Sequence, residues 1–262
     1  MKVSIIIPAH NEQRRIGKTL KVYSEYFEKL RKERILDYEI IVSINATTDK
    51  TKDIVKSFQK SNKRILYLDL IQGGKGHAII EGFKLALKDK RELIGFVDAD
   101  LATPPEAFHD LIKNIGDYDG VIASRWLKGS IIRTKQTLLR KITSNGFNFV
   151  VRSMLFLPYA DTQCGAKLFK KDTIAKVING LNITKWAFDI DLLYNIKREK
   201  LNIKEIPTIW EDKKESKLNL IVVPFQMFIA VLRIRLLHSP FGFVIKAYDH
   251  LPESLKIHHR FN

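Results

Sequence analysis

Short apolar segments alternate with longer segments of mixed apolar and charged residues through the first half of the chain. The short segments are rich in Val, Ile and Leu and are bounded by Gly, Pro, Asn or Asp, which is typical of buried strands. The longer segments repeat their apolar residues with the period of a helix. This order predicts an α/β fold, a mostly parallel sheet with helices on both faces. The expected strands are residues 3–7, 38–44, 65–69, 93–97 and 120–124, and the expected helices are residues 16–32, 51–59, 77–88 and 105–115.

The second half of the chain is less regular. Residues 127–157 are basic and amphipathic, residues 161–165 are typical of a loop, and residues 203–209 are expected to form a further strand. From residue 218 the chain is apolar and aromatic. We therefore expect a main domain over residues 1–217 and a C-terminal segment of amphipathic helices over residues 218–262.

Within the apolar part of this tail, residues 218–237, the longest stretch without a charge is residues 218–232, and it is interrupted by Asn219, Pro224 and Gln226. A membrane-spanning helix needs about 20 predominantly apolar residues, so this segment is too short and too interrupted to span. Its bulky apolar residues end in Arg233 and Arg235, a combination that suits the interface between acyl chains and lipid phosphates. We expect the tail to dock on a membrane surface; the alternative is that it packs on the sheet as core helices.

The formal net charge of +16 over 262 residues predicts attraction to polyanions, which include nucleic acid, anionic lipid and phosphorylated substrates. The basic residues are spread over the expected helices and form no block interleaved with aromatic residues, so no nucleic-acid partner is expected. Cys164 is the single cysteine, which excludes an internal disulfide framework and fits a reducing compartment.

The strand expected at residues 93–97 ends in Asp98 and Asp100, and residues 103–106 (Thr-Pro-Pro-Glu) then start a helix. Side chains two positions apart on an extended segment point to the same side. Both carboxylates therefore face one pocket at the carboxyl edge of the sheet, where ligands of such sheets bind. Paired carboxylates suit Mg²⁺ or Mn²⁺, which takes its other ligands from water and phosphate oxygens. Taken alone, Asp-x-Asp is also typical of a plain turn after a strand.

Two further motifs leave alternatives open. Residues 73–76 (Gly-Gly-Lys-Gly) follow the third strand without the spacing of a Walker loop or of a dinucleotide-binding loop, so Lys75 either meets a phosphate or base or is solvated. Asp189 and Asp191 are either a second metal pair or the acidic start of a helix.

Four segments together resemble one enzyme class: Pro-Ala-His-Asn-Glu at 8–12, Asp-Ala-Asp at 98–100, Ala-Ser-Arg at 123–125 and Asp-Thr-Gln-Cys-Gly-Ala-Lys-Leu-Phe at 161–169. The chain is similar to the inverting glycosyltransferases with the GT-A fold, in the branch that transfers sugars to polyprenyl phosphates. Within that branch it resembles the dolichyl-phosphate β-glucosyltransferases. The resemblance extends over about residues 2–245, and the nine-residue match at 161–169 is its most specific part.

The resemblance implies a GT-A nucleotide-diphospho-sugar transferase fold, with residues 1–217 as the catalytic domain. It implies a metal-dependent hexosyltransferase that moves a sugar, glucose from UDP-glucose being the expected donor, to a polyprenyl or dolichyl phosphate. Such an enzyme is expected in the cytoplasm, peripheral on the cytoplasmic face of the membrane. The family has a pair of aspartates where this chain has Ile44 and Asn45; an amide still bonds a base or ribose but carries no charge.

The roles that the resemblance assigns are as follows. Asp98 and Asp100 hold Mg²⁺ or Mn²⁺, and Asp100 and Asp161 are the candidate catalytic residues, Asp161 by positioning the sugar or the acceptor. The nucleotide sugar is bound by Pro8, Ala9, Asn11, Glu12, Asn45, Lys75 and Asp98. The acceptor phosphate is bound by Arg125, Arg140, Ser144 and Lys217.

Two other functions stay open from the sequence. One is a transferase of the same class that acts on a sugar hydroxyl in polysaccharide or glycolipid synthesis, which needs a firm catalytic base and no lipid. The other is a non-catalytic basic module that binds membranes or nucleic acid and tolerates the loss of both Asp98 and Asp100. The sequence does not distinguish glucose from galactose, N-acetylglucosamine or glucuronate donors.

Overall fold

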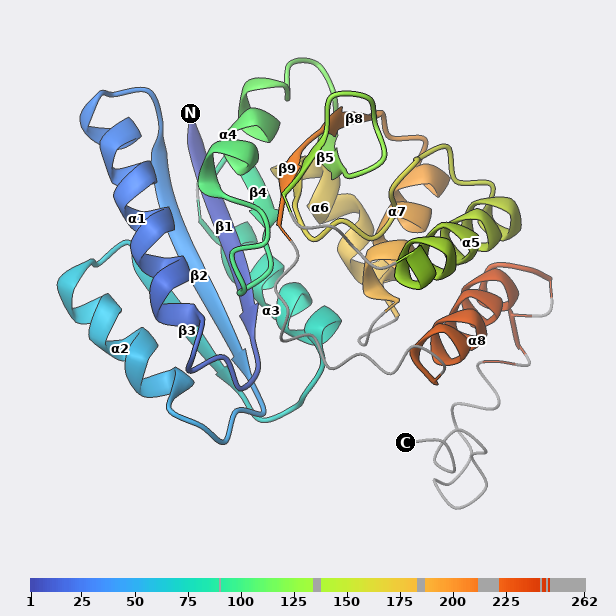
Figure 1. Cartoon of the computed structure of the whole chain (residues 1–262), viewed down its shortest axis with the longest axis horizontal. Helices are drawn as coiled ribbons and strands as arrows, with labels where there is room; N and C mark the ends of the chain where they lie inside the picture. Colours follow the sequence, from blue (N-terminus) through green and yellow to red (C-terminus); the bar gives the residue numbers. More distant parts are fainter. Residues whose placement is uncertain are drawn as a thin grey trace.

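A seven-stranded sheet in the order β3-β2-β1-β4-β7-β5-β8 forms the centre of the described part of the chain (Figure 1). The computed structural model describes residues 1–89, 91–133, 138–182, 187–211, 222–240, 242–243 and 245. The strands of this sheet are β1 (Lys2–Ala9), β2 (Asp37–Asn45), β3 (Ile65–Leu70), β4 (Leu93–Phe96), β5 (Gly120–Ser124), β7 (Lys167–Lys170) and β8 (Ile203–Pro207).

The predicted mostly parallel sheet is confirmed. β3, β2, β1 and β4 pair in parallel with one another, and so do β5 and β8. β7 lies between β4 and β5 and runs antiparallel to both. The sequence did not predict β7, because its four residues begin and end with lysine. The strand expected at 203–209 is divided at Thr208, and its end, β9 (Ile209–Trp210), pairs with β6 (Ile131–Ile132) in a separate small sheet.

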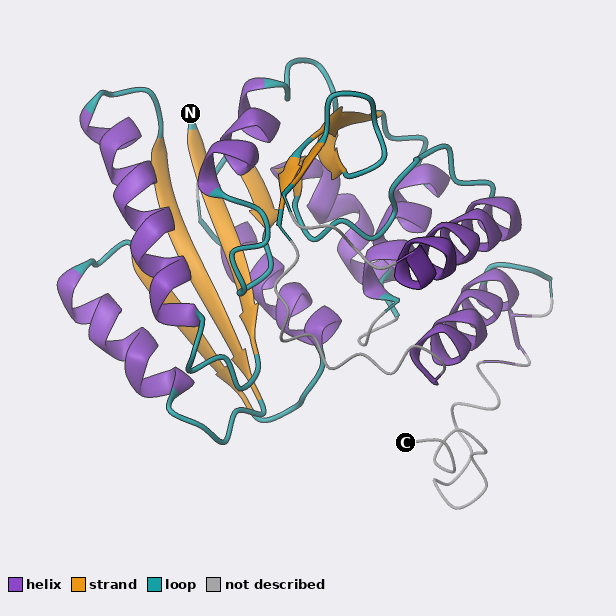
Figure 2. Ribbon diagram, in the orientation of Figure 1, coloured by secondary structure: helices purple, strands orange, loops and turns teal. Residues whose placement is uncertain are grey.

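Helices cover both faces of the sheet, as predicted (Figures 1 and 2). In β1, Ile5 and Ile7 belong to the core on one side and Ile6 to the core on the other, so both faces of the strand are buried. Helices α1, α2 and α4 contribute to the first core, and α3, α6 and α7 to the second. The helices are α1 (Ile16–Lys32), α2 (Thr51–Ser61), α3 (Lys75–Leu87), α4 (Pro105–Lys113), α5 (Leu138–Leu155), α6 (Lys171–Val177), α7 (Phe188–Arg198) and α8 (Val222–Leu237), with a 3₁₀ turn at Ile178–Gly180.

The C-terminal helix α8 lies beside α5 at the end of the molecule farthest from α1 and α2 (Figure 1). Met227, Val231 and Ile234, spaced four and three residues apart, are buried in the second core, whereas Phe228 and Ile229 are exposed. Core packing thus accounts for one side of α8 and leaves an apolar side open. Residues 218–221 and the expected division at residue 217 lie outside the described residues, so the two-part organisation stays a prediction. Within the described part of the chain, no helix is long and apolar enough to cross a membrane.

Candidate active site

Loops that follow four parallel strands meet at the carboxyl edge of the sheet, as the sequence predicts. Asn45, the last residue of β2, joins three of them. Its Nδ2 donates a hydrogen bond to the carbonyl of Ala9 at 3.0 Å, and its Oδ1 accepts one from the backbone N–H of Gly74 at 3.0 Å. The side chain is buried. The amide therefore holds the loops together, and its predicted contact with a base or ribose stays a prediction.

The loop after β1 is held to the loop after β2 by Asn11. This residue has a left-handed backbone, with φ of 53°, and its Oδ1 accepts a hydrogen bond from the backbone N–H of Thr48 at 2.9 Å. Pro8 and Ala9, at the end of β1, are buried. The nucleoside contacts predicted for Pro8, Ala9 and Asn11 stay predictions, but the structure does bring these residues to the predicted edge.

Glu12 lies close to the carboxylates at the end of β4. Its two carboxylate oxygens accept hydrogen bonds from Nε and Nη2 of Arg15, both at 2.6 Å. Burial raises the pKa of Glu12, Arg15 lowers it, and the negative charges of Asp100 and Asp98 raise it, with the net result above the ordinary value. The acidic residues of two predicted loops are therefore close enough for their charges to interact.

Asp98 and Asp100 differ in what they contact. An oxygen of Asp98, Oδ1, lies 2.8 Å from the ammonium of Lys75. Asp100 accepts a hydrogen bond on Oδ1 from the backbone N–H of Ala102 at 3.0 Å. Burial and then the charge of Asp98 raise the pKa of Asp100 above its ordinary value. Negative charge is thus concentrated at Asp100, where a bound cation would relieve it.

Helix α1 fixes the backbone of the Asp98–Asp100 loop. Thr19 donates a hydrogen bond from Oγ1 to the carbonyl of Ala99 at 2.6 Å, and Tyr23 donates one to the carbonyl of Thr103 at 2.9 Å. Leu101 between them has a left-handed φ of 59°, which turns the chain sharply after the second carboxylate. The two carboxylates therefore stand on a rigid backbone, which lowers the cost of orienting them for a ligand.

The carboxylate pair fits a hard divalent cation. Asp98 and Asp100 supply oxygen ligands, and the described residues contain no cluster of three or more His, Cys, Asp or Glu side chains suited to a metal. Mg²⁺ and Mn²⁺ accept such a site, because one or two carboxylates are completed by water and by phosphate oxygens of a substrate. A structural zinc site, which needs four protein ligands, does not match this donor set.

The loop at residues 161–165 passes directly against Asp98. A Cβ built on Gly165 would lie 1.9 Å from Oδ2 and 2.5 Å from Cγ of Asp98. No side chain other than that of glycine fits this space, since real Cβ contacts are far longer. The sequence segment with the most specific family resemblance is therefore in contact with the predicted metal ligands.

Asp161 organises that loop. Its Oδ2 accepts hydrogen bonds from the backbone N–H and Nε of Arg125, and its Oδ1 from Nη2 of Arg125 and the backbone N–H groups of Gln163 and Cys164, at 2.7 to 3.2 Å. Burial raises the pKa of Asp161, but Arg125 outweighs it and holds the pKa below its ordinary value. Both oxygens of Asp161 are occupied by these donors, and its predicted catalytic role stays a prediction.

Arg125 is partly buried, with 15% of its side-chain surface exposed, and lies between two aromatic rings. Its Cζ is 5.7 Å from the ring centroid of Trp126 and 5.3 Å from that of Trp210. Trp210 belongs to β9, and the next residue, Glu211, donates its backbone N–H to the carbonyl of Ala102 at 2.9 Å. The small β6–β9 sheet therefore contacts the loop that follows Asp100, and Arg125 lies at the same edge of the main sheet.

The other predicted acceptor residues are only partly described. Arg140 and Ser144 lie on α5, whose course is described, but their side chains lie outside the described residues, as does Lys217. Their predicted phosphate contacts stay predictions.

The alternative of a second metal pair at Asp189 and Asp191 is wrong. Both residues lie in the first turn of α7, where residues two apart do not face each other. Asp189 pairs with Lys167 at 2.6 Å, whereas Asp191 accepts a hydrogen bond from the backbone N–H of Asn182 at 2.8 Å. The sequence assigned no role to Lys167, although this residue lies in the 161–169 segment, because nothing in a local pattern distinguishes a buried lysine from a solvated one.

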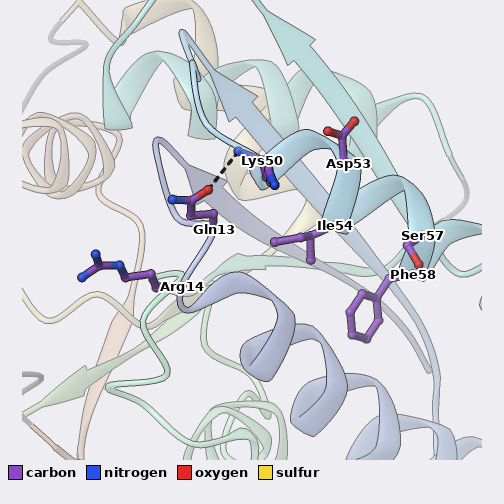
Figure 3. A pocket seen from close by; sticks show the side chains of 7 residues that line it. All are labelled: Gln13, Arg14, Lys50, Asp53, Ile54, Ser57 and Phe58. Carbon is purple, nitrogen blue, oxygen red and sulfur yellow. Dashed lines mark hydrogen bonds between the residues drawn. The ribbon is translucent and has the colours of Figure 1, made fainter.

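A shallow groove on the outer surface lies between the start of α1 and helix α2 (Figure 3). Both polar and apolar side chains line it, and Gln13 accepts a hydrogen bond from the backbone N–H of Lys50 at 3.3 Å. The lining residues are Gln13, Arg14, Lys50, Asp53, Ile54, Ser57 and Phe58. None of them is a predicted site residue, so the groove is separate from the carboxylate site.

Comparison with known proteins agrees with this geometry. Residues 4–178 match the model of the family Glycosyl transferase family 2. The dolichyl-phosphate beta-glucosyltransferase of Dictyostelium discoideum is 34% identical over 246 residues, which cover 89% of this chain and 73% of that protein. The dolichyl-phosphate beta-glucosyltransferase of Homo sapiens is 30% identical over 235 residues, covering 86% of this chain and 70% of that protein.

A solved structure shares the fold. Glucosyl-3-phosphoglycerate synthase from Mycobacterium tuberculosis, in complex with Mn²⁺, UDP-glucose and glycerol 3-phosphate, superposes with a TM-score of 0.64 at 16% identity. The match covers 89% of this chain and 79% of that chain. The predicted GT-A fold and the family resemblance are thereby confirmed. The chain is a glycosyltransferase and belongs to glycosyl transferase family 2.

Proposed function

We propose that this glycosyltransferase transfers glucose from UDP-glucose to the phosphate of a polyprenol such as dolichol. The observation that carries the proposal is the contact between Gly165 and Asp98. This contact places the loop of the Asp161–Arg125 pair next to the carboxylates at the end of β4. The Asp161–Arg125 pair suits an anionic acceptor, and the carboxylates suit the cation that accompanies a nucleotide diphosphate. Supporting it, relatives at about 30% identity are named dolichyl-phosphate beta-glucosyltransferases, and the Mycobacterium tuberculosis synthase has been crystallised with Mn²⁺ and UDP-glucose.

The proposed reaction is an in-line displacement at the anomeric carbon. An oxygen of the acceptor phosphate forms the new bond to that carbon, the bond to the donor diphosphate breaks, and UDP leaves with the electron pair. The configuration therefore inverts. Bound at Asp98 and Asp100, Mg²⁺ or Mn²⁺ would offset negative charge on the departing diphosphate.

The residues around Asp161 suit a phosphate acceptor better than a hydroxyl. A phosphate monoester is already ionised at neutral pH, so transfer to it needs no strong general base. Asp161 has both oxygens occupied by donors and is ill suited to accept a proton. Arg125 gives Nε and Nη2 to Asp161, and no described residue accepts a hydrogen bond from its Nη1. We assign that end of the guanidinium to the acceptor phosphate.

A membrane surface suits such an acceptor, and the exposed side of α5 and α8 provides the matching surface. Phe149 on α5, Phe156 just after it, and Ile229 on α8 are 71%, 66% and 47% exposed. The Cζ of Arg235 lies 5.5 Å from the ring centroid of Phe156, and Arg152 is also exposed. Aromatic and aliphatic side chains edged by arginines fit an anionic lipid bilayer.

This surface is joined to the site through α8. Gln163, in the loop of Asp161, donates a hydrogen bond from Nε2 to Sδ of Met227 at 3.6 Å, and Phe228 next to Met227 is exposed. We propose peripheral attachment at this surface, on the cytoplasmic face of the membrane, where a free thiol such as Cys164 is stable.

The test is a donor and acceptor screen with the purified chain. UDP-glucose, UDP-galactose, UDP-N-acetylglucosamine, UDP-glucuronate and GDP-mannose are each incubated with polyprenyl phosphate and Mn²⁺ or Mg²⁺, and labelled sugar is followed into the lipid fraction. With UDP-glucose as donor, the expected product is polyprenyl β-glucosyl phosphate. Unphosphorylated polyprenol and a glucoside with free hydroxyls are the control acceptors. Transfer to the glucoside without polyprenyl phosphate would replace the proposal with the sugar-hydroxyl alternative.

A further inference from the structure

A fully buried lysine lies behind the carboxylate site. Lys167, in β7, has no exposed side-chain surface, and its Nζ donates hydrogen bonds to Oδ1 of Asp189 and to the carbonyl of Cys164, each at 2.6 Å. A buried ammonium without a partner costs several kcal/mol, so this lysine depends on Asp189. Burial raises the pKa of Asp189, but Lys167 and Lys75 outweigh it and lower the pKa below the ordinary value. Asp189 is thus a fixed negative charge.

Lys75 connects that buried pair to the site. It is the first residue of α3 and follows Gly74, which has a positive φ of 127°. Its Nζ lies 2.8 Å from Oδ1 of Asp98 and 3.4 Å from Oδ2 of Asp189. The ammonium is therefore shared between two carboxylates.

Asp98 and Asp189 compete for the ammonium of Lys75. The Lys75–Asp98 distance is the shorter, and the side chain of Asp98 is 37% exposed, whereas that of Asp189 is 6% exposed. Asp189 cannot move toward Asp98, because Lys167 holds its other oxygen. Any weakening of the attraction of Asp189 would let the ammonium move fully onto Asp98.

We propose that Lys75 is the resident counter-ion of Asp98, and that Asp189 is a positioning residue that competes with Asp98 for Lys75 and so eases its release when a divalent cation binds Asp98. The inference rests on the proposed metal site at Asp98 and Asp100. In the absence of a metal ion, Lys75 neutralises Asp98 and limits repulsion between Asp98 and Asp100. With a metal ion held by Asp98, Asp189 would keep the displaced ammonium paired, and the charge of Lys75 would favour an anionic donor.

The proposal predicts opposite effects of two substitutions on Mn²⁺ affinity. Lys75→Gln removes the competing charge, so free enzyme without nucleotide is expected to bind Mn²⁺ tighter by on the order of tenfold. The same variant is expected to bind UDP more weakly. Asp189→Asn leaves Lys75 with Asp98 as its only carboxylate partner among these residues and is expected to weaken Mn²⁺ binding by a similar factor. A residue with only a structural role would not move affinity upward in one variant and downward in the other.

The measurement is titration of the purified chain with Mn²⁺ without nucleotide, followed by the electron paramagnetic resonance signal of the free ion. Lys52→Gln is the matched control: Lys52 pairs with Asp69 on the surface, so the variant loses the same charge away from the site. Circular dichroism and thermal unfolding check the fold of each variant. If Asp189→Asn fails to fold, the Lys75→Gln titration decides alone, because Lys75 is not part of the fully buried pair.

The outcomes separate this inference from the metal site on which it rests. Wild-type chain that binds no Mn²⁺ in this titration or with UDP present overturns the metal site itself. Mn²⁺ binding that Asp100→Asn abolishes, together with unchanged or weaker binding in Lys75→Gln, leaves the metal site standing and overturns the role of Lys75 and Asp189.

Discussion

Gly165 and Asp98 lie in contact, so close that a methyl group on Gly165 would overlap the carboxylate of Asp98. The two residues belong to distant parts of the chain, one in the loop before β7 and the other at the end of β4, which pairs with β7. The antiparallel insertion of β7 next to β4 brings the 161–165 loop against Asp98, one of the two predicted metal ligands.

Gly165→Ala is expected to reduce turnover by about 10² or more while the chain still folds. The added methyl group must displace Asp98 or the loop, and a misplacement of about 1 Å at a reacting centre commonly costs that much. Steady-state rates, with circular dichroism for the fold, measure the effect. Gly146→Ala is the control, because a Cβ at Gly146 meets nothing within 4 Å. Equal activity of Gly165→Ala and wild type would show that the contact has no part in catalysis.

Asp100→Asn is expected to remove most metal-dependent turnover, because it keeps the shape of the side chain and removes the charge at a presumed metal ligand. The loss of one such electrostatic contact costs about 10² to 10³ in rate. Turnover is measured against Mn²⁺ and Mg²⁺ concentration. Asp110→Asn, which removes a surface carboxylate paired with Lys113, is the control. Near-normal turnover of Asp100→Asn that is still abolished by a chelator would remove Asp100 from the metal site.

Arg125→Lys is expected to raise KM for polyprenyl phosphate by about tenfold and to leave KM for UDP-glucose within about twofold. Lysine keeps the charge but loses the planar fork that serves Asp161 and a phosphate together. Initial rates with each substrate varied in turn measure the two constants. Arg34→Lys, on an exposed turn, is the control. An equal rise in both constants would assign Arg125 to the donor or to the fold alone.

Asp161→Asn is expected to destabilise the fold by about 3 kcal/mol at neutral pH, because it leaves the partly buried guanidinium of Arg125 without its charged partner. The pKa of Asp161 in the folded chain lies below its ordinary value of 3.8. The ion pair therefore stabilises fully above about pH 4, and its contribution is lost as the pH falls through the lowered pKa.

Urea unfolding from pH 7 down to pH 2 tests this pH dependence. Wild type is expected to lose stability below about pH 4, and Asp161→Asn to lose less over the same interval. Asp117→Asn, at an exposed position, is expected to change stability by less than about 0.5 kcal/mol. The same acid dependence in Asp161→Asn as in wild type would show that other carboxylates account for it.

The sequence predicted the sheet, the faces that the helices cover and the edge where the loops meet, because strand and helix periods are local properties of the chain. It also placed Glu12, Asp98 and Asp100 in one site. It did not predict that β7 is a strand, because the two lysines that begin and end it look solvated in sequence. Burial of Lys167 is explained by Asp189, which approaches through tertiary packing, and by the carbonyl of Cys164. Local patterns indicate where a charge lies along the chain, not which charge will face it.

Asn45 illustrates the same limit inside the predicted site. Its place at the end of β2 indicated a ligand-facing amide, yet the structure gives both polar atoms to Ala9 and Gly74. A backbone partner is invisible to sequence patterns, because every residue carries the same N–H and carbonyl groups.

The paired variant Phe149→Gln and Ile229→Gln is expected to weaken binding to anionic liposomes by about tenfold or more. At each position the bilayer would no longer bury the apolar surface of the native side chain. The free energy of that burial is about 1.5–3 kcal/mol for a fully buried side chain. Both residues are exposed, so the fold is expected to be retained. Co-sedimentation with vesicles that contain phosphatidylserine measures binding directly and needs no turnover. Ile35→Gln is the control: Ile35 is 50% exposed and belongs to the connection between α1 and β2, two elements that lie far from α8 (Figure 1). Equal sedimentation of the paired variant, the control and wild type would show that α5 and α8 do not form the docking surface, whatever the outcome for catalysis.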